Sequence, residues 1–410
     1  MVKRARATSR RVLTTLLKEI ISETMRPIPA YIIAAHRTAI GRIGGLHKSR
    51  RLEDLCAPVI AAALRDSDLE PAQIEDVIIG NASEGGNPAR LIALAAGLPE
   101  TASASTIDRQ CGSGLDAILA AIRIVAAGEV DIVVAGGAEA ISMAPWRIAK
   151  PSSIYQTPHF TRLQSVFDEQ GDGPPLVEAA EALWSRLGIN RAQQDAYALR
   201  SHLKAEAARR AKRFINEIVP MRANPEETRD QSAIEPDLKD LSQLAPYLPP
   251  DGTLTPGNTS AMHDGAAFAI VVSQPVWESL AKPRALRLVA STAQGVRPDN
   301  EPSAPIEAMK KLKERLNGHA PTDIGIFEMS ESSAAQAIAL AQSLDIDEDL
   351  VNPDGGAIAR GHPFGAASAV LVTRLFTRMV RGKDNNGPEL GVATLGVFGG
   401  MGLAALFESV

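Results

Sequence analysis

Short aliphatic runs alternate with stretches of helical periodicity along most of the chain after residue 28. The aliphatic runs predict strands, which we place at residues 31–35, 76–80, 132–134, 268–272, 286–291, 324–328, 391–395 and 403–408. Apolar residues spaced three and four apart predict helices over residues 52–64, 115–125, 191–214, 307–316, 334–344 and 366–379. This alternation indicates an α/β fold in which helices cover both faces of the sheet.

Residues 146–252 interrupt the alternation. They are rich in proline, include one strongly charged helical stretch and carry an acidic patch at residues 226–240. Long insertions of this kind usually carry binding and specificity, so we interpret the segment as a loop domain over the core. The rest of the chain then divides into an N-terminal half, residues 28–145 completed by 253–277, and a C-terminal half, residues 278–410.

The first 27 residues stand apart from this pattern. Lysine and arginine precede any acidic residue, and an apolar helical stripe runs from Val12 to Ile21. Such an extension fits an organellar transit segment, a helix that docks on a partner, or upstream codons with Met25 as the true start. We favour the last two interpretations together.

Composition narrows the classes of function. Charged side chains make up 22% of the 410 residues and the formal net charge is −5, which offers no general attraction to nucleic acid or acidic membranes. Aromatic residues make up only 4%, too few for a platform on which bases stack. No apolar run has the length of a membrane span.

Cysteine and histidine usage argues against disulfides and metals. Two cysteines cannot form a disulfide framework, so we expect a reducing compartment: the cytoplasm, or the mitochondrion if residues 1–27 are a transit segment. The sequence holds no Walker loop, no HExxH motif and no CxxC pair, and its seven histidines are scattered. We expect no metal and no permanently bound cofactor.

One cysteine lies where a polar turn meets the start of a predicted helix. The stretch Thr106-Ile-Asp-Arg-Gln-Cys111-Gly-Ser-Gly places Cys111 at the helix N-terminus, with glycines on its C-terminal side. Free backbone N–H groups and the positive end of the helix dipole would lower the pKa of the thiol, and the thiolate is the nucleophile. The alternative is a buried cysteine that only packs, which is our interpretation of Cys56 on the apolar stripe of its own helix.

The second half repeats this arrangement. The turn Gly355-Gly-Ala-Ile-Ala-Arg-Gly-His362-Pro-Phe-Gly opens a helix of small residues, as the Cys111 turn does in the first half. A duplicated β–α core would bring the two turns together near a pseudo-twofold axis, where thiolate and imidazole form a nucleophile–base pair. A structural histidine is the alternative, but a position between glycine and proline is hard to explain by core packing.

Five motifs in the same order resemble the thiolase family over residues 29–410. They are Arg109-Gln-Cys-Gly-Ser-Gly, Gly136-Gly-Ala-Glu-Ala-Ile-Ser-Met-Ala-Pro, Gly257-Asn-Thr-Ser with Asp264-Gly-Ala-Ala, Gly355-Gly-Ala-Ile with Gly361-His-Pro, and Gly399-Gly-Met-Gly. The resemblance implies a five-layered αβαβα fold of two similar βαβ halves with an inserted loop domain. It also implies acyl transfer between coenzyme A and a β-ketoacyl-CoA through an acyl-cysteine, with the coenzyme A thioester as substrate.

The resemblance assigns roles by position. Cys111 would be the acylated nucleophile and a member of one oxyanion hole. His362 would be the activating base and would help to hold the thioester oxygen. Ser260 would contact the pantetheine arm of the substrate. Met143 falls in a stretch that reaches toward the active site of a partner subunit, so we expect a homodimer or homotetramer.

The chain departs from the family at positions that concern proton transfer and the pocket. Gly396 stands where the family has a second cysteine, which moves the proton at the substrate α-carbon. Ser330 replaces an asparagine that holds a water in one oxyanion hole, and would hold it only from a shifted place. Phe398 replaces a glycine whose backbone N–H serves the other hole, which would reshape that turn. Ser332 and Ser333 replace alanine and phenylalanine, which would make the pocket wider and more polar.

A positioned acid–base group is worth about 10²–10⁴-fold in rate, so the loss of the second cysteine should slow ordinary thiolase chemistry severely. Three hypotheses follow for the function of the chain. We favour a thiolase-like acyltransferase with altered acid–base chemistry that acts on an acyl-CoA or β-ketoacyl-CoA thioester. One alternative is an ordinary β-ketothiolase in which another group substitutes for the cysteine. The other is a catalytically impaired protein that binds acyl-CoA or scaffolds a complex. Decarboxylating ketoacyl synthases fit less well, because their histidine–asparagine pair is not found at Ser330 and His362.

Overall fold

The computed structural model describes residues 28–151, 153–158, 160, 176–221, 225–232, 236–316, 324–382 and 387–410. The extension at residues 1–27 lies outside the described residues, so its three interpretations stay predictions.

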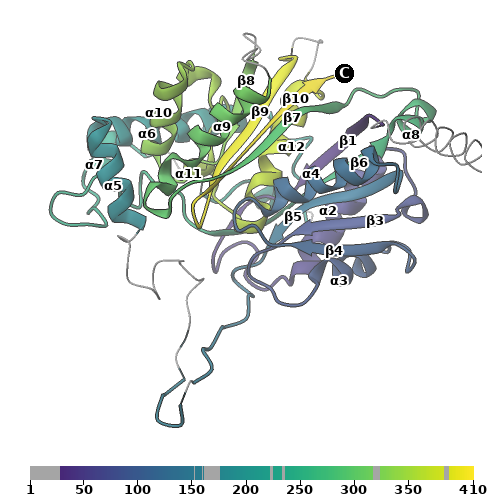
Figure 1. Ribbon diagram of the computed structural model, residues 1–410, viewed down its shortest axis with the longest axis horizontal. Coiled ribbons are helices and arrows are strands. Elements are labelled where there is room, and N and C mark those ends of the chain that lie inside the picture. The colour runs from purple at the N-terminus through teal and green to yellow at the C-terminus, as the bar shows by residue number, and fades with distance from the viewer. Residues whose placement is uncertain are drawn as a thin grey trace, which may run out of the picture.

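Within the described ranges, ten strands form one sheet (Figure 1). Its order is β4-β3-β5-β6-β1-β7-β10-β9-β8, with β2 paired to β6. The strands are β1 (Ala30–Arg37), β2 (Gly41–Arg42), β3 (Asp76–Gly80), β4 (Ser103–Ile107), β5 (Ile132–Glu139), β6 (His263–Ser273), β7 (Leu286–Gly295), β8 (Ile324–Met329), β9 (Leu390–Val397) and β10 (Met401–Ser409).

The strand order contains an internal duplication. The N-terminal half runs β4-β3-β5-β6-β1, and the C-terminal half runs back from the centre as β7-β10-β9-β8. In both halves an antiparallel pair stands beside parallel strands: β5–β6 beside β3–β5, and β9–β10 beside β8–β9. The first strands of the halves, β1 and β7, pair at the centre through Tyr31 with Arg287 and Ile32 with Leu286. The two predicted similar halves are therefore present.

Helices lie on both faces of each half-sheet. They are α2 (Leu52–Asp66), α3 (Pro88–Ala95), α4 (Ser113–Ala126), α5 (Leu176–Arg186), α6 (Arg191–Arg210), α7 (Leu238–Ser242), α8 (Gln274–Ser279), α9 (Ala304–Arg315), α10 (Ala334–Leu344), α11 (Ala357–Arg360) and α12 (Ala367–Met379). Single 3₁₀ turns are η1 (Pro71–Gln73), η2 (Pro225–Thr228), η3 (Pro298–Ser303), η4 (Glu348–Leu350) and η5 (Phe364–Ala366). None of these helices has the length and apolar character that a bilayer crossing requires.

Three hydrophobic cores define five layers. The central core contains α4 and α12, and the outer cores contain α2 with α3 and α9 with α10. Successive strand residues point to different cores, since side chains alternate across a strand: Val133 faces the centre and Val134 the N-terminal outer core, while Leu403 faces the centre and Ala404 the C-terminal outer core. The five-layered αβαβα fold is confirmed.

The predicted elements are present with shifted ends, and seven further elements have no counterpart in the prediction: β2, β4, α3, α5, α7, α8 and α11. β4 is a short strand of largely polar sequence, which gives no aliphatic run. α3 is short and leaves Leu91 and Leu94 half exposed, so its stripe is weak. α5 lies in the inserted segment, where the sequence predicts only the helix over residues 191–214. The helix predicted over 191–214 ends at Arg210, because Lys212 takes a left-handed φ of 56°.

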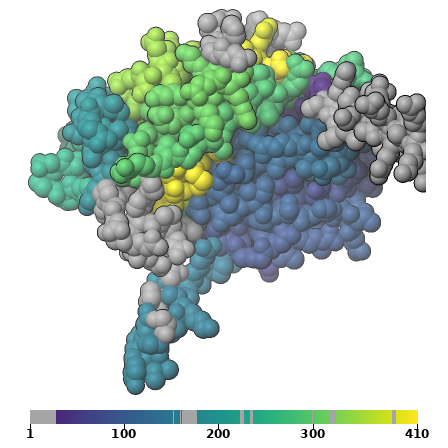
Figure 2. Space-filling model, in the orientation of Figure 1, coloured from purple at the N-terminus to yellow at the C-terminus, as the bar shows by residue number. Residues whose placement is uncertain are grey.

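The inserted segment packs on the C-terminal half. Trp184 of α5 and Tyr197 of α6 are buried in the same core as α9 and α10. In Figure 1, α5, α6 and α7 lie beside α10 and α11. Figures 1 and 2 also show the segment after β5 projecting from the body of the protein.

Candidate active site

The Cys111 turn is closed by its own neighbours, two residues before α4. Gln110 has a left-handed φ of 50°, which is uncommon for a residue other than glycine. The Gly112 N–H donates to the Arg109 carbonyl at 2.9 Å, and Ser113 Oγ donates to the Gln110 carbonyl at 2.6 Å. Strained backbone of this kind occurs where the surrounding structure holds a side chain for a function. The predicted place of the cysteine, just before the helix, is confirmed.

The thiol of Cys111 does not have the lowered pKa that its place at a helix start suggested. Burial raises the pKa of Cys111 to about 12, and the charges of Glu301 and Glu139 add to the increase. The backbone amides of Phe398 and of Cys111 itself oppose this by hydrogen bonding to the sulfur. The cost of desolvating the thiolate exceeds the benefit from these dipoles. Resting Cys111 is therefore a neutral thiol that needs a base as it attacks.

His362 is held through both its ring and its backbone. Its Nδ1 lies 3.1 Å from Ser330 Oγ, and its Nε2 has no hydrogen-bond partner in the described part of the chain. Its N–H donates to His263 Nδ1 at 3.3 Å, while the His263 N–H donates to the His362 carbonyl at 3.0 Å. Gly361 has a φ of 106°, and a side chain there would collide with the His263 ring. Burial lowers the pKa of His362 to about 4, so the ring is a neutral base at pH 7.

The two turns meet where α4 and α12 begin. The Leu115 N–H donates to Ser368 Oγ at 2.8 Å, and a side chain at Gly114 would come within 2.9 Å of the Gly365 carbonyl. The carboxylate of Glu139, at the end of β5, accepts the Gly365 N–H at 2.9 Å. The N-terminal half thus holds the turn that carries His362, as the duplicated core predicted.

The β9–β10 hairpin turn closes the site next to Cys111. A side chain at Gly112 would lie 2.9 Å from Val397 Cγ2, so the Cys111 turn packs directly on this hairpin. Phe398, despite its larger side chain, still directs its backbone N–H at the sulfur. Gly396 lies one residue before Val397, with the Gln336 amide nitrogen 3.0 Å from where its Cβ would be. Because residue 396 is glycine, it has no side chain that could exchange a proton with the substrate.

One acidic side chain at this turn was not singled out in the sequence. Glu301, on η3, is only 8% exposed, and its Oε2 accepts the N–H groups of Gly399 at 2.9 Å and Gly400 at 3.0 Å. Burial raises the pKa of Glu301 to about 7, although these two hydrogen bonds favour the charged form. Position 301 follows no periodicity, so only the fold reveals its place.

The serines predicted to contact substrate lie along one edge of the site. The Ser260 N–H donates to the Ser332 carbonyl at 3.1 Å, which places the predicted pantetheine segment beside the Ser330–Ser333 stretch. Ser333 is 6% exposed and its Oγ accepts the Gln336 N–H, so this hydroxyl caps α10. Met143 is half exposed on the segment after β5. The substrate contacts of these residues stay predictions.

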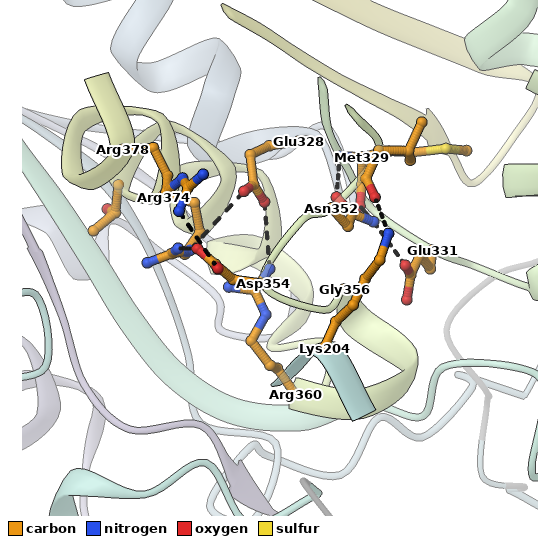
Figure 3. A network of polar contacts seen from close by, with 12 residues as sticks. Lys204, Glu328, Met329, Glu331, Asn352, Asp354, Gly356, Arg360, Arg374 and Arg378 are labelled. Carbon is orange, nitrogen blue, oxygen red and sulfur yellow. Dashed lines mark hydrogen bonds and ion pairs between the residues drawn. The ribbon is translucent and has the colours of Figure 1, made fainter. Parts of the chain in front are cut away.

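A buried charge network includes Arg360 and Asp354 from the segment that leads to His362, together with Glu328 and Arg374 (Figure 3). Arg374 of α12 is fully buried and contacts Glu217 and Asp354. Arg360, two residues before His362, lies 3.4 Å from Glu328. Burial raises the pKa of Glu328 to about 7, and Arg360 and Arg374 oppose that rise. The network ties the C-terminal half to the inserted segment, from which Glu217 comes.

Beside this network, Glu331 fixes the loop before α11. Its carboxylate accepts hydrogen bonds from Tyr197 at 3.0 Å, Ser201 at 2.9 Å, Asn352 at 2.7 Å and the Ile358 N–H at 3.2 Å. Glu331 thereby fixes the segment that carries Ser330.

The two cysteines are buried and form no disulfide with each other. Cys56 is fully buried, as predicted for a packing residue, and burial raises its pKa well above the ordinary value. Over the described residues, no three histidine, cysteine or acidic side chains gather as metal ligands would.

Comparison with known proteins agrees with this geometry. The description "Thiolase, N-terminal domain" matches residues 30–275, and "Thiolase, C-terminal domain" matches residues 282–409. The chain belongs to the thiolase family. It is an acyltransferase of the thiolase type.

Similar proteins match most of this chain and nearly all of their own length. A Staphylococcus epidermidis protein named "Putative acetyl-CoA C-acetyltransferase VraB" is 38% identical over 92% of this chain and 97% of its own length. A Bacillus subtilis protein named "Putative acetyl-CoA C-acetyltransferase YhfS" is 38% identical over 92% of this chain and 99% of its own. The crystal structure of the Bacillus anthracis acetyl-CoA acetyltransferase superposes with a TM-score of 0.86 at 31% identity, over 94% of this chain and all of that one.

Proposed function

We propose that this thiolase transfers an acyl group from an acyl-CoA or β-ketoacyl-CoA thioester through an acyl-cysteine at Cys111, with acid–base chemistry that differs from the family's. The observation that carries the proposal is the meeting of the Cys111 turn with the His362 turn. Acylation needs a nucleophile, a base and an oxyanion hole. The names of the similar acetyl-CoA acyltransferases support a coenzyme A thioester as substrate.

The first step uses groups described above. With the Nδ1 proton directed at Ser330 Oγ, Nε2 of His362 takes the proton of the Cys111 thiol as sulfur attacks the thioester carbonyl. The backbone N–H groups of Cys111 and Phe398 face the sulfur and can receive the oxyanion that develops beside it. The C–S bond to coenzyme A breaks, and His362 returns the proton to the leaving thiolate. An acyl-Cys111 and free coenzyme A remain.

Carbon–carbon bond formation or cleavage needs one more group, which moves a proton at the substrate α-carbon. Gly396 has no side chain for this role, and Ser330 meets His362 Nδ1 directly. In the synthetic direction the altered chemistry therefore affects the carbon–carbon step, and acylation of Cys111 by an acyl-CoA does not need a group at position 396. With a β-ketoacyl-CoA as donor, acylation of Cys111 is itself the carbon–carbon cleavage and does need the α-carbon proton.

The test is the intact mass of the protein after incubation with a panel of acyl-CoA and β-ketoacyl-CoA thioesters. We expect an acyl adduct on the wild type, with the panel naming the preferred acyl group, and none on Cys111→Ala. A folded wild type that gains no mass with any thioester would overturn the proposal and favour the binding role.

Three further assignments belong to this proposal. We divide the chain into the halves and loop domain given above, with boundaries at 145/146, 252/253 and 277/278. We place the protein in the cytoplasm, in keeping with two buried, unpaired cysteines. We also propose a homodimer or homotetramer, supported by Trp146, Ile154 and Tyr155, which are 84%, 90% and 91% exposed on the projecting segment.

A further inference from the structure

The β9–β10 turn has a titratable side chain on each side of it. Cys111 lies on one side, where the Phe398 N–H meets its sulfur. Glu301 lies on the other side, where its Oε2 accepts the next two N–H groups of the same turn, from Gly399 and Gly400. Three consecutive backbone amides therefore separate the nucleophile from a buried carboxyl group.

The segment that carries Glu301 also lies next to Gly396. The Gln336 side-chain amide donates to the Pro302 carbonyl at 3.0 Å, and the same amide nitrogen lies 3.0 Å from the position of a Cβ at Gly396. Pro305 Cδ, on the same segment as Glu301, lies 3.4 Å from that position. The Cβ position of Gly396 thus faces Gln336 and the start of α9, next to the segment that carries Glu301.

The contacts of Glu301 differ from those of the buried Glu328. Glu301 has no cationic partner among the described residues, whereas Arg360 and Arg374 accompany the buried Glu328. Its Oε2 is occupied by two N–H groups, and its Oε1 accepts no hydrogen bond from the described part of the chain. A buried carboxyl group without a counter-ion can hold or release a proton near neutral pH, as acid–base catalysis requires.

The geometry points to Glu301 as the catalytic acid–base group that moves the proton at the α-carbon of the substrate, in place of the side chain absent at Gly396. This inference rests on the proposed function, because it concerns the half-reaction that follows acylation of Cys111. It makes carbon–carbon chemistry possible for this thiolase.

In the synthetic direction, Glu301 starts as the carboxylate. Glu301 carboxylate takes a proton from the α-carbon of a second acyl-CoA. The resulting carbanion attacks the carbonyl carbon of acyl-Cys111, a C–C bond forms, and the C–S bond to Cys111 breaks. The Cys111 thiolate takes up a proton, and Glu301 releases the one it gained. In cleavage, protonated Glu301 gives its proton to the α-carbon of the leaving acyl-CoA.

The test separates the two half-reactions. Acylation is followed as the intact mass of the protein with acetyl-CoA. Proton abstraction is followed as deuterium incorporation at the methyl carbon of acetyl-CoA in deuterated water. We expect Glu301→Gln to form the Cys111 adduct at a rate within about threefold of the wild type and to lose at least about 10²-fold in deuterium exchange. Glu307→Gln, on the exposed face of α9, is the matched control and should leave both rates unchanged.

Two more variants guard against a simple loss of folding. Glu301→Asp keeps the charge but withdraws the carboxyl group by one methylene, and should lose at least about tenfold in exchange because such a misplacement is costly. The double variant Glu301→Gln/Gly396→Cys places a thiol at position 396 and should regain deuterium exchange into acetyl-CoA. Retention of the adduct shows that each variant is folded.

The outcomes distinguish the two proposals. An adduct on the wild type with exchange at the wild-type rate in Glu301→Gln or Glu301→Asp overturns the role of Glu301 and leaves the acyltransferase intact. Absence of any adduct on the wild type overturns the proposed function, and this inference with it.

Discussion

The turns that carry Cys111 and His362 open equivalent helices, yet they are held in different ways. The Cys111 turn is local: its hydrogen bonds join residues 109–113, and one strained backbone angle at Gln110 sets its direction. The His362 turn depends on distant residues, among them Glu139 from the other half and the Arg360–Glu328 pair. The nucleophile is thus placed by a short sequence, and the base by the assembled tertiary structure.

The two turns should differ in how well their geometry tolerates mutations elsewhere in the protein. The shape of a locally closed turn survives changes elsewhere in the protein, because the hydrogen bonds that close it join neighbours in the sequence. A turn fixed by buried charges loses its geometry when any one charge is removed, since an unpaired buried charge is costly. Mutations far from the chemistry should therefore disturb His362 more than Cys111.

The largest effect is expected from His362→Ala. Without the imidazole no base receives the Cys111 proton, and burial keeps that thiol neutral, so acylation should slow by about 10²–10⁴-fold. Rapid-quench intact mass with acetyl-CoA measures the rate. His36→Ala, at a partly exposed pair with Asp66, is the control and should acylate normally. Equal rates in the two variants would show that another base serves Cys111.

Arg374→Met should destabilise the fold by about 3–5 kcal/mol, because it removes the fully buried cation that contacts both Glu217 and Asp354. The change leaves these buried carboxylates with Arg37 and Arg213 as their remaining close partners. Urea unfolding measures the loss. Arg287→Met breaks a partly exposed pair with Glu408 and should cost about 1 kcal/mol or less. Similar losses for both variants would contradict the view that buried charges hold the C-terminal half.

The stability of the fold should depend on pH through the buried carboxyl group of Glu301. Its folded pKa of about 7 lies above the ordinary value, so its protonated form favours the fold. That stability is fully present below about pH 4.5 and is lost as pH rises through 7, at about 1.4 kcal/mol per pKa unit. Glu301→Gln removes this dependence, so its stability relative to the wild type should rise by about 2–3 kcal/mol between pH 5 and pH 8. Urea unfolding at both pH values tests this, and a constant difference would contradict it.

The smallest effect is expected from Ser330→Ala. It removes one hydrogen bond to His362 Nδ1, worth about 1 kcal/mol, and should slow acylation about fivefold. The rapid-quench assay with acetyl-CoA resolves a change of this size. Ser330→Asn provides the longer side chain for comparison. An unchanged rate in Ser330→Ala would mean that the other contacts of His362 are sufficient to orient it.

Features that depend on neighbouring residues could be predicted from the sequence, and features that depend on distant residues could not. The Cys111 turn could be placed from a short motif, since its partners are its neighbours. The strand alternation and the two halves could be predicted because hydrophobic periodicity records them directly. The pKa of Cys111 could not be predicted, because its burial and its interactions with Phe398 and Glu301 arise only in the fold.

Other features left no signal in the sequence. β4 is mostly polar, so periodicity missed it. Glu301 looks like a surface acid beside a proline, and only its hydrogen bonds to Gly399 and Gly400 show otherwise. The hydroxyl of Ser333 caps α10, a role that depends on where the helix begins, and the wider pocket expected at Ser333 stays a prediction.

The high pKa of the Cys111 thiol also bears on how the protein withstands oxidants. Peroxides and electrophiles react with thiolates, and a cysteine kept neutral by burial is poorly reactive toward them. The sulfur becomes nucleophilic only while a thioester occupies the site and His362 accepts its proton. An idle molecule therefore keeps its nucleophile reduced, and its reactivity is restricted to the moment of turnover.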